Sequence, residues 1–175
     1  YLGISSGRCS VKQGGNGCAG LELFFALYED SRFFHCQKQY EGNEEIAVLY
    51  ANALLNLMVK QSLEECQQSI DRLRGLYERY EGNGNVLADY AGGLCVLIIK
   101  QPLEECQQSS NELKILYEHF RDNKEIATMY MKGLVNVSFA QDTEEDVRRT
   151  IQESQKILNQ YPDNIELQLT YAQTW

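Results

Sequence analysis

Apolar residues recur at alternating steps of three and four between Leu63 and Tyr80. The stripe consists of Leu63, Cys66, Ile70, Leu73, Tyr77 and Tyr80. Residues three and four apart share one face of a helix, so the spacing indicates an amphipathic α-helix. Ser62 followed by Glu65 has the spacing of a capping box, which marks the helix start. We expect the helix to end near Gly82, because this glycine can adopt the left-handed conformation that stops helices.

The segment before this helix is apolar on nearly every side. From Ile46 to Val59, Asn52 and Asn56 are the polar residues in the middle of the run. A helix without a polar face must be covered by neighbours over most of its circumference. The pattern therefore predicts a first helix that packs against several others, followed by the amphipathic second helix.

This pair of segments recurs along the chain with a period of about 40 residues. The leading aromatics are Tyr40, Tyr80, Phe120 and Tyr161, and ten residues after each stands Tyr50, Tyr90, Tyr130 or Tyr171. Pro102 stands in the first turn of one second helix, and Asp142 with Glu145 has the capping-box spacing in the next. Self-similarity at a fixed period predicts stacked helical hairpins.

The repeats divide the chain into three full units and two flanking half-units. We expect an all-α fold with units at 43–82, 83–122 and 123–162 inside a single helical-repeat domain, 21–175. Residues 1–20 hold six of the thirteen glycines. This composition predicts a flexible Gly/Ser-rich leader.

These motifs resemble the tetratricopeptide-repeat family. Tyr50 is followed by the pair Ala53-Leu54 and by Leu57, and Leu63-Glu-Glu-Cys66 opens the second helix. The chain departs from the family at Leu54, Leu94 and Leu134, where a glycine is usual, and its period exceeds the family's usual length of about 34 residues. The resemblance implies a right-handed array of antiparallel helical hairpins, and a HEAT-like array is the alternative fold.

In that family the first helices line a concave groove that binds peptides, so the resemblance implies a groove on the first helices here. The candidate peptide-contacting residues are Asn52, Leu55, Asn56, Val59, Cys95, Ile99, Lys132, Val135 and Asn136, and the carried-over positions extend to Phe139. Asparagine carries donors and acceptors that could hold a peptide backbone, while the apolar members would take its side chains. The alternative is that the apolar members are buried between units and the asparagines meet water.

Charge and cysteine placement narrow the choice of partners. The net charge is −9 and the 16 basic residues are scattered, which argues against nucleic acid and against an anionic membrane surface. No apolar run approaches the length of about 18 residues that suggests a membrane span. Cys66 and Cys106 occupy one repeat position twice, so we interpret them, and Cys95, as buried thiols in a reduced, cytoplasmic setting.

No arrangement of residues predicts catalysis, a metal site or a cofactor. The two histidines are His35 and His119, and His119 falls at a solvated helix position. Glu64 and Glu65 stand in a first helical turn, where carboxylates favour the helix dipole. We therefore expect a non-enzymatic scaffold that binds a protein or peptide. The alternatives are a structural, self-associating array that forms a homodimer, and an accessory helical domain of a larger enzyme or secretion machine.

Overall fold

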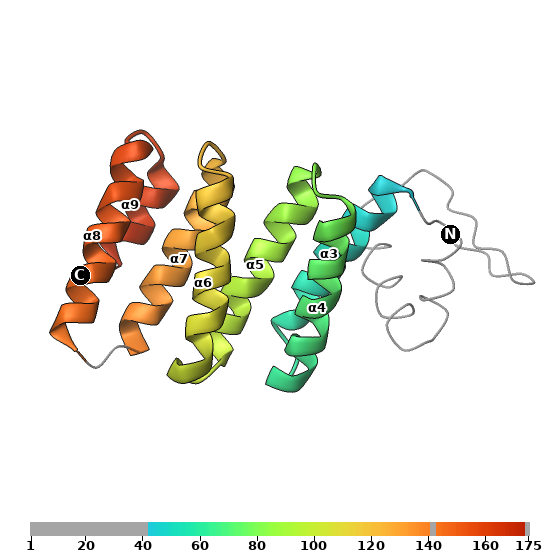
Figure 1. Ribbon diagram of the computed structural model, residues 1–175, viewed down its shortest axis with the longest axis horizontal. Helices are drawn as coiled ribbons and strands as arrows, with labels where there is room; N and C mark the ends of the chain where they lie inside the picture. The colour runs from blue at the N-terminus through green and yellow to red at the C-terminus, as the bar shows by residue number, and fades with distance from the viewer. Residues whose placement is uncertain (1–41, 141–142, 174–175) are drawn as a thin grey trace, which may run out of the picture. The chain divides into compact units, whose positions relative to one another are not determined.

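The computed structural model describes residues 42–140 and 143–173, and the regular elements in these ranges are seven α-helices (Figure 1). The all-α fold class expected from the sequence is confirmed. The helices are α3 (Glu44–Met58), α4 (Leu63–Arg79), α5 (Gly84–Lys100), α6 (Leu103–His119), α7 (Lys124–Ala140), α8 (Glu144–Gln160) and α9 (Ile165–Ala172). The leader expected at 1–20 and the half-unit expected at 21–40 lie outside the described residues.

The chain divides into two compact units, Tyr1–Ile46 and Ala47–Trp175. Of the first unit, the described part is 42–46, where Gly42 has a φ of 98° and Asn43 accepts a hydrogen bond from the Ile46 backbone. The second unit contains the rest of α3 and the other helices.

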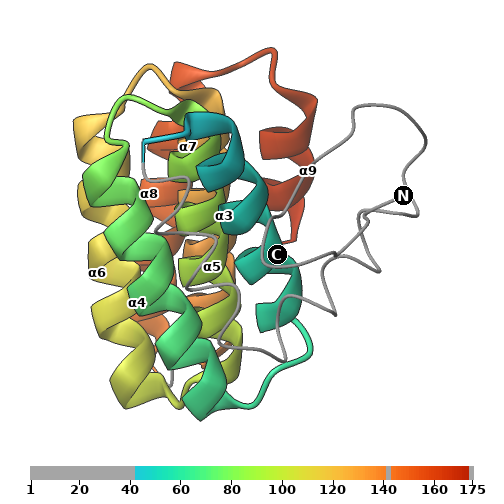
Figure 2. The ribbon, with the colours of Figure 1, turned by 90° about the vertical axis from the view of Figure 1, so that its right-hand side faces the viewer.

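The first helices of successive hairpins pack on one another as well as on the second helices. α5 contacts α4, α6 and α7, and α7 contacts α5, α6, α8 and α9. Figure 2 looks along this succession and shows α4 and α6 on one side of α5 and α7. An almost continuously apolar helix such as α5 is covered in this way by α4, α6 and α7, and Leu55 of α3 also packs on it, which explains its lack of a polar face.

Capping residues set the helix starts. The capping box of α4 is confirmed, because Ser62 accepts from the Glu65 backbone and the Glu65 carboxylate accepts from the Ser62 backbone. Each first helix in the second unit begins after an asparagine whose side chain accepts backbone N–H groups of the first turn: Asn83, Asn123 and Asn164. Of the box expected at Asp142 and Glu145, Asp142 lies outside the described residues; the N-cap of α8 is Thr143, whose side chain accepts from the Asp146 backbone.

The expectation of a left-handed Gly82 is wrong. α4 ends at Arg79 with Tyr80 as its C-cap, and Gly42 is the glycine with positive φ among those described. The Asn83 N–H donates to the Tyr80 carbonyl at 2.8 Å, so a turn closes between the two helices without a left-handed glycine. Asn83, rather than Gly82, is the residue that this connection needs.

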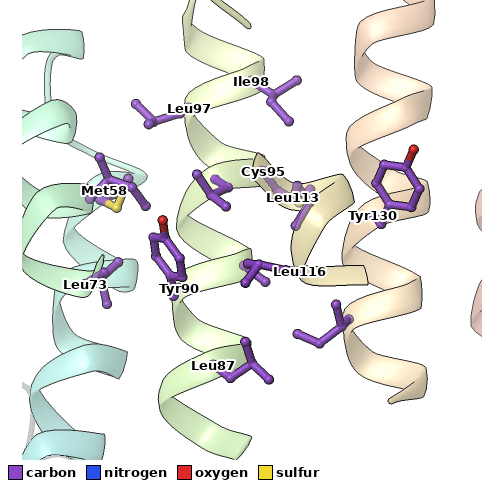
Figure 3. Close-up of a cluster of buried hydrophobic side chains, with 14 of the residues drawn as sticks. Met58, Leu73, Leu87, Tyr90, Cys95, Leu97, Ile98, Leu113, Leu116 and Tyr130 are labelled. Carbon is purple, nitrogen blue, oxygen red and sulfur yellow. The ribbon is translucent and has the colours of Figure 1, made fainter. Parts of the chain in front are cut away.

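The core runs between the two layers of helices. Figure 3 shows Leu87, Tyr90 and Leu97 projecting from α5, among Met58, Leu73, Leu113 and Leu116 of neighbouring helices. Cys66, Cys95 and Cys106 are buried free thiols, which confirms their interpretation as core residues. Burial raises the pKa of the Cys66 and Cys106 thiols.

Two buried glycines allow first helices to approach the second helix of the preceding hairpin closely. A Cβ atom at Gly93 would lie 2.7 Å from Ile70 Cδ1 and 2.9 Å from Leu73 Cδ1. At Gly133 it would lie 2.9 Å from Leu113 Cδ2. Both positions follow Ala53 at steps of 40 residues. The repeat therefore has a small-residue position, directly before the leucines that stand where tetratricopeptide repeats usually have glycine.

Candidate functional site

The nine candidate groove residues lie at three different depths. Asn52, Asn56, Val59 and Ile99 are exposed, whereas Leu55, Lys132 and Asn136 are partly buried. Cys95 and Val135 are buried. The first helices thus present part of the candidate set to solvent and enclose the rest.

Cys95 and Val135 are enclosed because the first helices pack directly on one another. The Cys95 thiol donates to the Met129 carbonyl of α7 at 3.1 Å, and burial raises its pKa to about 12. Val135 stands at the equivalent position of α7. For these two residues the alternative interpretation, burial between units, describes their environment. We leave both out of the candidate site below.

Three exposed apolar side chains stand at one repeat position near the ends of the first helices. Val59 directly follows α3 and is 62% exposed, Ile99 on α5 is 66% exposed, and Phe139 on α7 is 74% exposed. We call these three residues the apolar row. Lys100 Nζ donates to the Val59 carbonyl at 3.2 Å, which holds the end of α3 beside the end of α5. Single exposed apolar residues are ordinary, but three in register on adjacent helices are typical of an interaction surface.

Beside the apolar row, α3 and α5 carry a polar cluster. Asn56 Nδ2 donates to the Asn52 carbonyl at 2.8 Å and to Asn52 Oδ1 at 3.0 Å. Asn52 Nδ2 in turn reaches Asp89 Oδ1 at 3.5 Å, the outer limit of a hydrogen bond. The two asparagines therefore act as a connected pair, in which one amide is fixed by the other.

Asp89 was missed in the sequence analysis, although a signal was present. It is the acidic residue in the otherwise apolar run of α5, at the position that holds Leu49 and Met129 in the adjacent units. The side chain is only 9% exposed, and desolvation raises its pKa to about 6 against the opposing effect of the Asn52 hydrogen bond. For packing alone, leucine or methionine would be better in that place, because neither has a charge to desolvate.

Lys132 and Asn136 lie on α7 and are not hydrogen-bonded to the asparagine pair of α3. Lys132 Nζ forms an ion pair with Glu166 of α9 at 2.8 Å. At the position equivalent to Asn52 and Lys132, α5 carries Gly92. Leu55 of α3 packs against this glycine, since a Cβ at Gly92 would lie 3.0 Å from Leu55 Cδ2. Of the four polar residues expected on one surface, the asparagine pair is thus bonded to α5, and Lys132 is bonded to α9.

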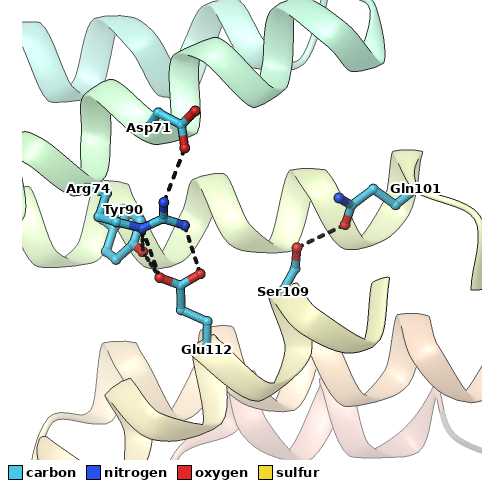
Figure 4. Close-up of polar contacts among 6 residues, drawn as sticks. All are labelled: Asp71, Arg74, Tyr90, Gln101, Ser109 and Glu112. Carbon is cyan, nitrogen blue, oxygen red and sulfur yellow. Dashed lines mark hydrogen bonds and ion pairs between the residues drawn. The ribbon is translucent and has the colours of Figure 1, made fainter. Parts of the chain in front are cut away.

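A second polar arrangement joins successive hairpins on the other side of α5. The Arg74 guanidinium contacts the Glu112 carboxylate through Nε and Nη2, both at 3.0 Å, and Tyr90 donates its hydroxyl to the same carboxylate (Figure 4). The next hairpin repeats the contact, since Tyr130 donates to Glu153 at 2.7 Å and Lys114 pairs with Glu153 at 3.1 Å. We call each such set a tyrosine–glutamate–cation latch. The latches account for two of the recurring tyrosines of the sequence pattern, Tyr90 and Tyr130.

The histidines, a metal site and a membrane span were the other features considered in the sequence. His119 is exposed, and its ring packs edge-on against Phe120 at 4.7 Å between centroids. Within residues 42–140 and 143–173 no three His, Cys, Asp or Glu side chains are grouped so as to hold a metal ion. None of the seven helices combines the length and the apolar character needed to cross a membrane. His35 lies outside the described residues.

Comparisons of the chain with models of protein families, with curated proteins and with solved structures give no match. The resemblance to tetratricopeptide repeats therefore stays an expectation drawn from motifs. The function has to be argued from the surface of the first helices.

Proposed function

We propose that the chain is a non-catalytic binding scaffold that holds a segment of a partner protein on the exposed face of its first helices. The observation that carries the proposal is the apolar row, three large side chains more than half exposed at one position of adjacent helices. Asn52 and Asn56 stand beside it and offer amide groups to a peptide backbone.

The proposal includes a tetratricopeptide-like array of antiparallel hairpins. Support comes from the helix starts, which recur at intervals of 40 residues. α4 and α6 begin at Leu63 and Leu103, and α5 and α7 begin at Gly84 and Lys124. The direct packing of α5 on α7 also supports it. In such an array the first helices form one continuous surface, on which equivalent positions line up across hairpins.

Burial of the apolar row would contribute substantially to association. Covering one large apolar side chain contributes about 1.5–3 kcal/mol, so three contribute up to about 4.5–9 kcal/mol. The entropy lost on binding is of the same order, so the hydrogen bonds of the asparagine pair and further contacts of the segment complete the complex. This surface is suited to an apolar or amphipathic segment.

The apolar row also supports a second candidate, a self-associating array in which another copy of the chain covers it. Sedimentation velocity of the purified chain separates the two. A monomer leaves the row free for a partner, whereas a dimer that dissociates on Ile99→Asp shows that the row is a homotypic interface.

The binding proposal is tested by affinity capture from a lysate of the source cell, followed by mass spectrometry and calorimetry with the purified partner. The test variant is Ile99→Asp with Phe139→Asp, and the matched control is Ile115→Asp, which changes a side chain 65% exposed on α6. We expect a partner that binds the wild type and the control but not the double variant. A partner set unchanged by the double variant would contradict the proposal.

A further inference from the structure

Asp89 is a buried carboxylate that the described part of the chain leaves without a cation. Its single hydrogen-bond partner there is Asn52, at 3.5 Å. Glu112 and Glu153 are more exposed than Asp89, yet Arg74 and Lys114 pair with them at 3.0 and 3.1 Å. Among the described residues, the fold thus supplies cations to the latch carboxylates and none to Asp89 on the first-helix face.

An unpaired carboxylate in such a place is costly to the folded chain. Burial disfavours the charged form, which must be paired or hydrogen-bonded to be stable. Asn52 supplies one long hydrogen bond, and its amide is itself fixed by Asn56 at 3.0 Å. Met129, at the same position of the next hairpin, is partly buried without this cost, whereas Leu49 in the preceding hairpin is 68% exposed. Asp89 therefore keeps the capacity for a strong ionic hydrogen bond with a ligand.

We infer that Asp89 receives a lysine or arginine side chain from the segment bound on the first-helix face. The inference rests on the proposed function and specifies its ligand. Charge complementarity supports a basic ligand, because the chain carries a net charge of −9. A cation at Asp89 would complete a charge-assisted hydrogen bond in a setting from which water is largely excluded. One carboxylate with one amide is too small a ligand set for a bound metal ion.

The position of Asp89 also predicts the spacing within the ligand. Ile99 lies ten residues further along α5, about 15 Å along the helix axis, and Val59 lies seven residues beyond Asn52, about 10 Å. An extended peptide advances about 3.3 Å per residue. A segment that fills both sites therefore carries a basic residue roughly three to five positions from a large apolar one.

Phage display with a random 12-residue peptide library, selected on the purified wild-type chain, tests the inference. Selected peptides are then synthesised with a fluorescent label, and their affinities are measured by fluorescence anisotropy. We expect enrichment of lysine or arginine three to five positions from an apolar residue. Asp89→Asn should weaken binding of such a peptide on the order of 30-fold. The control Asp122→Asn removes an exposed carboxylate and should leave the affinity unchanged.

The peptide supplies the complementary variant. Replacing its basic residue by glutamine should weaken binding to the wild type and leave binding to Asp89→Asn nearly unchanged, because both changes remove the same contact. Near-ultraviolet circular dichroism of Asp89→Asn checks that the variant is folded.

The possible failures are distinguishable. One outcome is that the selected peptides depend on Ile99 but contain no basic residue and bind Asp89→Asn as well as the wild type. This outcome overturns the role of Asp89 and leaves the proposed function standing. Selected peptides that are indifferent to Ile99→Asp, or a selection that yields none, overturn both. A dimer that covers Asp89 and competes with the peptides overturns the peptide ligand in favour of a second copy.

Discussion

At the scale of single residues, the partly buried carboxylate of Glu112 and the buried carboxylate of Asp89 differ in how their charge is compensated. Glu112 accepts hydrogen bonds from an arginine and a tyrosine hydroxyl, so its charge is compensated on folding. Asp89 is desolvated with one long hydrogen bond, so its charge is not. The first arrangement stabilises the fold, and the second retains the capacity for a contact that folding does not use.

Asp89→Asn should therefore stabilise the folded chain at neutral pH. The pKa of Asp89 is about 6 in the folded chain, above the ordinary aspartate value, so the ionised carboxylate destabilises the fold as the pH rises from about 4 to 6. We expect the variant to gain about 1–3 kcal/mol at pH 7.5 and nothing near pH 3.5. Urea unfolding at the two pH values measures this difference. A loss of stability at pH 7.5 would show that the carboxylate is compensated.

Gly93→Ala and Gly75→Ala should have opposite effects on stability. Alanine favours a helix over glycine by about 1 kcal/mol at both sites. At Gly75 nothing lies within 4 Å of the added Cβ, whereas at Gly93 it would meet Ile70 and Leu73, both of which are fully buried. We expect a gain of about 1 kcal/mol at Gly75 and a loss of about 1–2 kcal/mol at Gly93. Thermal unfolding of both variants provides the comparison, and equal shifts would mean that the helices do not pack this closely.

At the scale of elements, each hairpin is fixed by contacts to the preceding one, and the latches are the polar part of these contacts. Arg74 on α4, Tyr90 on α5 and Glu112 on α6 belong to three consecutive helices. The tyrosines also stack on the second helix of the preceding hairpin: Tyr77 with Tyr90 at 5.5 Å and Tyr117 with Tyr130 at 5.0 Å between ring centroids. A repeated tyrosine thus serves the junction between hairpins as well as the core.

Removing the charge of Glu112 should loosen one junction. In Glu112→Gln the Arg74 guanidinium and the Tyr90 hydroxyl lose a charged acceptor, which typically costs about 1.5–3 kcal/mol for a partly buried group. The exposed Glu78→Gln on α4 is the control and should change stability by less than about 0.5 kcal/mol. Equal effects of the two substitutions in urea unfolding would show that the latch contributes nothing beyond surface charge.

The sequence predicted the helices well because their signals are local. The capping box at Ser62 and the stripe from Leu63 to Tyr80 depend on residues within a few turns of each other. The candidate site depends on the angle and distance between helices, which local spacing does not determine. Cys95 and Ile99 are four residues apart on α5, yet one is buried and the other exposed. Asp89 was missed for the same reason, since its burial is produced by a neighbouring helix.

At the scale of the whole second unit, stability should vary along the array, because each hairpin is held mainly by its neighbours. α5 is covered by α4, α6 and α7, and most of its residues are buried. Within the described residues, α9 has eight residues and packs on α7 and α8, with Ile165 and Leu169 exposed. Opening α9 therefore breaks fewer contacts than opening α5.

Native-state hydrogen exchange should show this gradient. Amides in the middle of α5, from Ala88 to Leu97, should exchange only through global unfolding, because any smaller opening would separate α5 from α4, α6 and α7. Amides of α9 should exchange through local opening, with protection on the order of tenfold or more below that of α5. Adding urea in small steps should accelerate exchange in α5 and leave α9 nearly unaffected, because only global opening exposes a large area. Equal protection and equal urea sensitivity would instead describe one cooperative block, in which the hairpins have no separate stabilities and a ligand on the first-helix face would stabilise α5 and α9 alike.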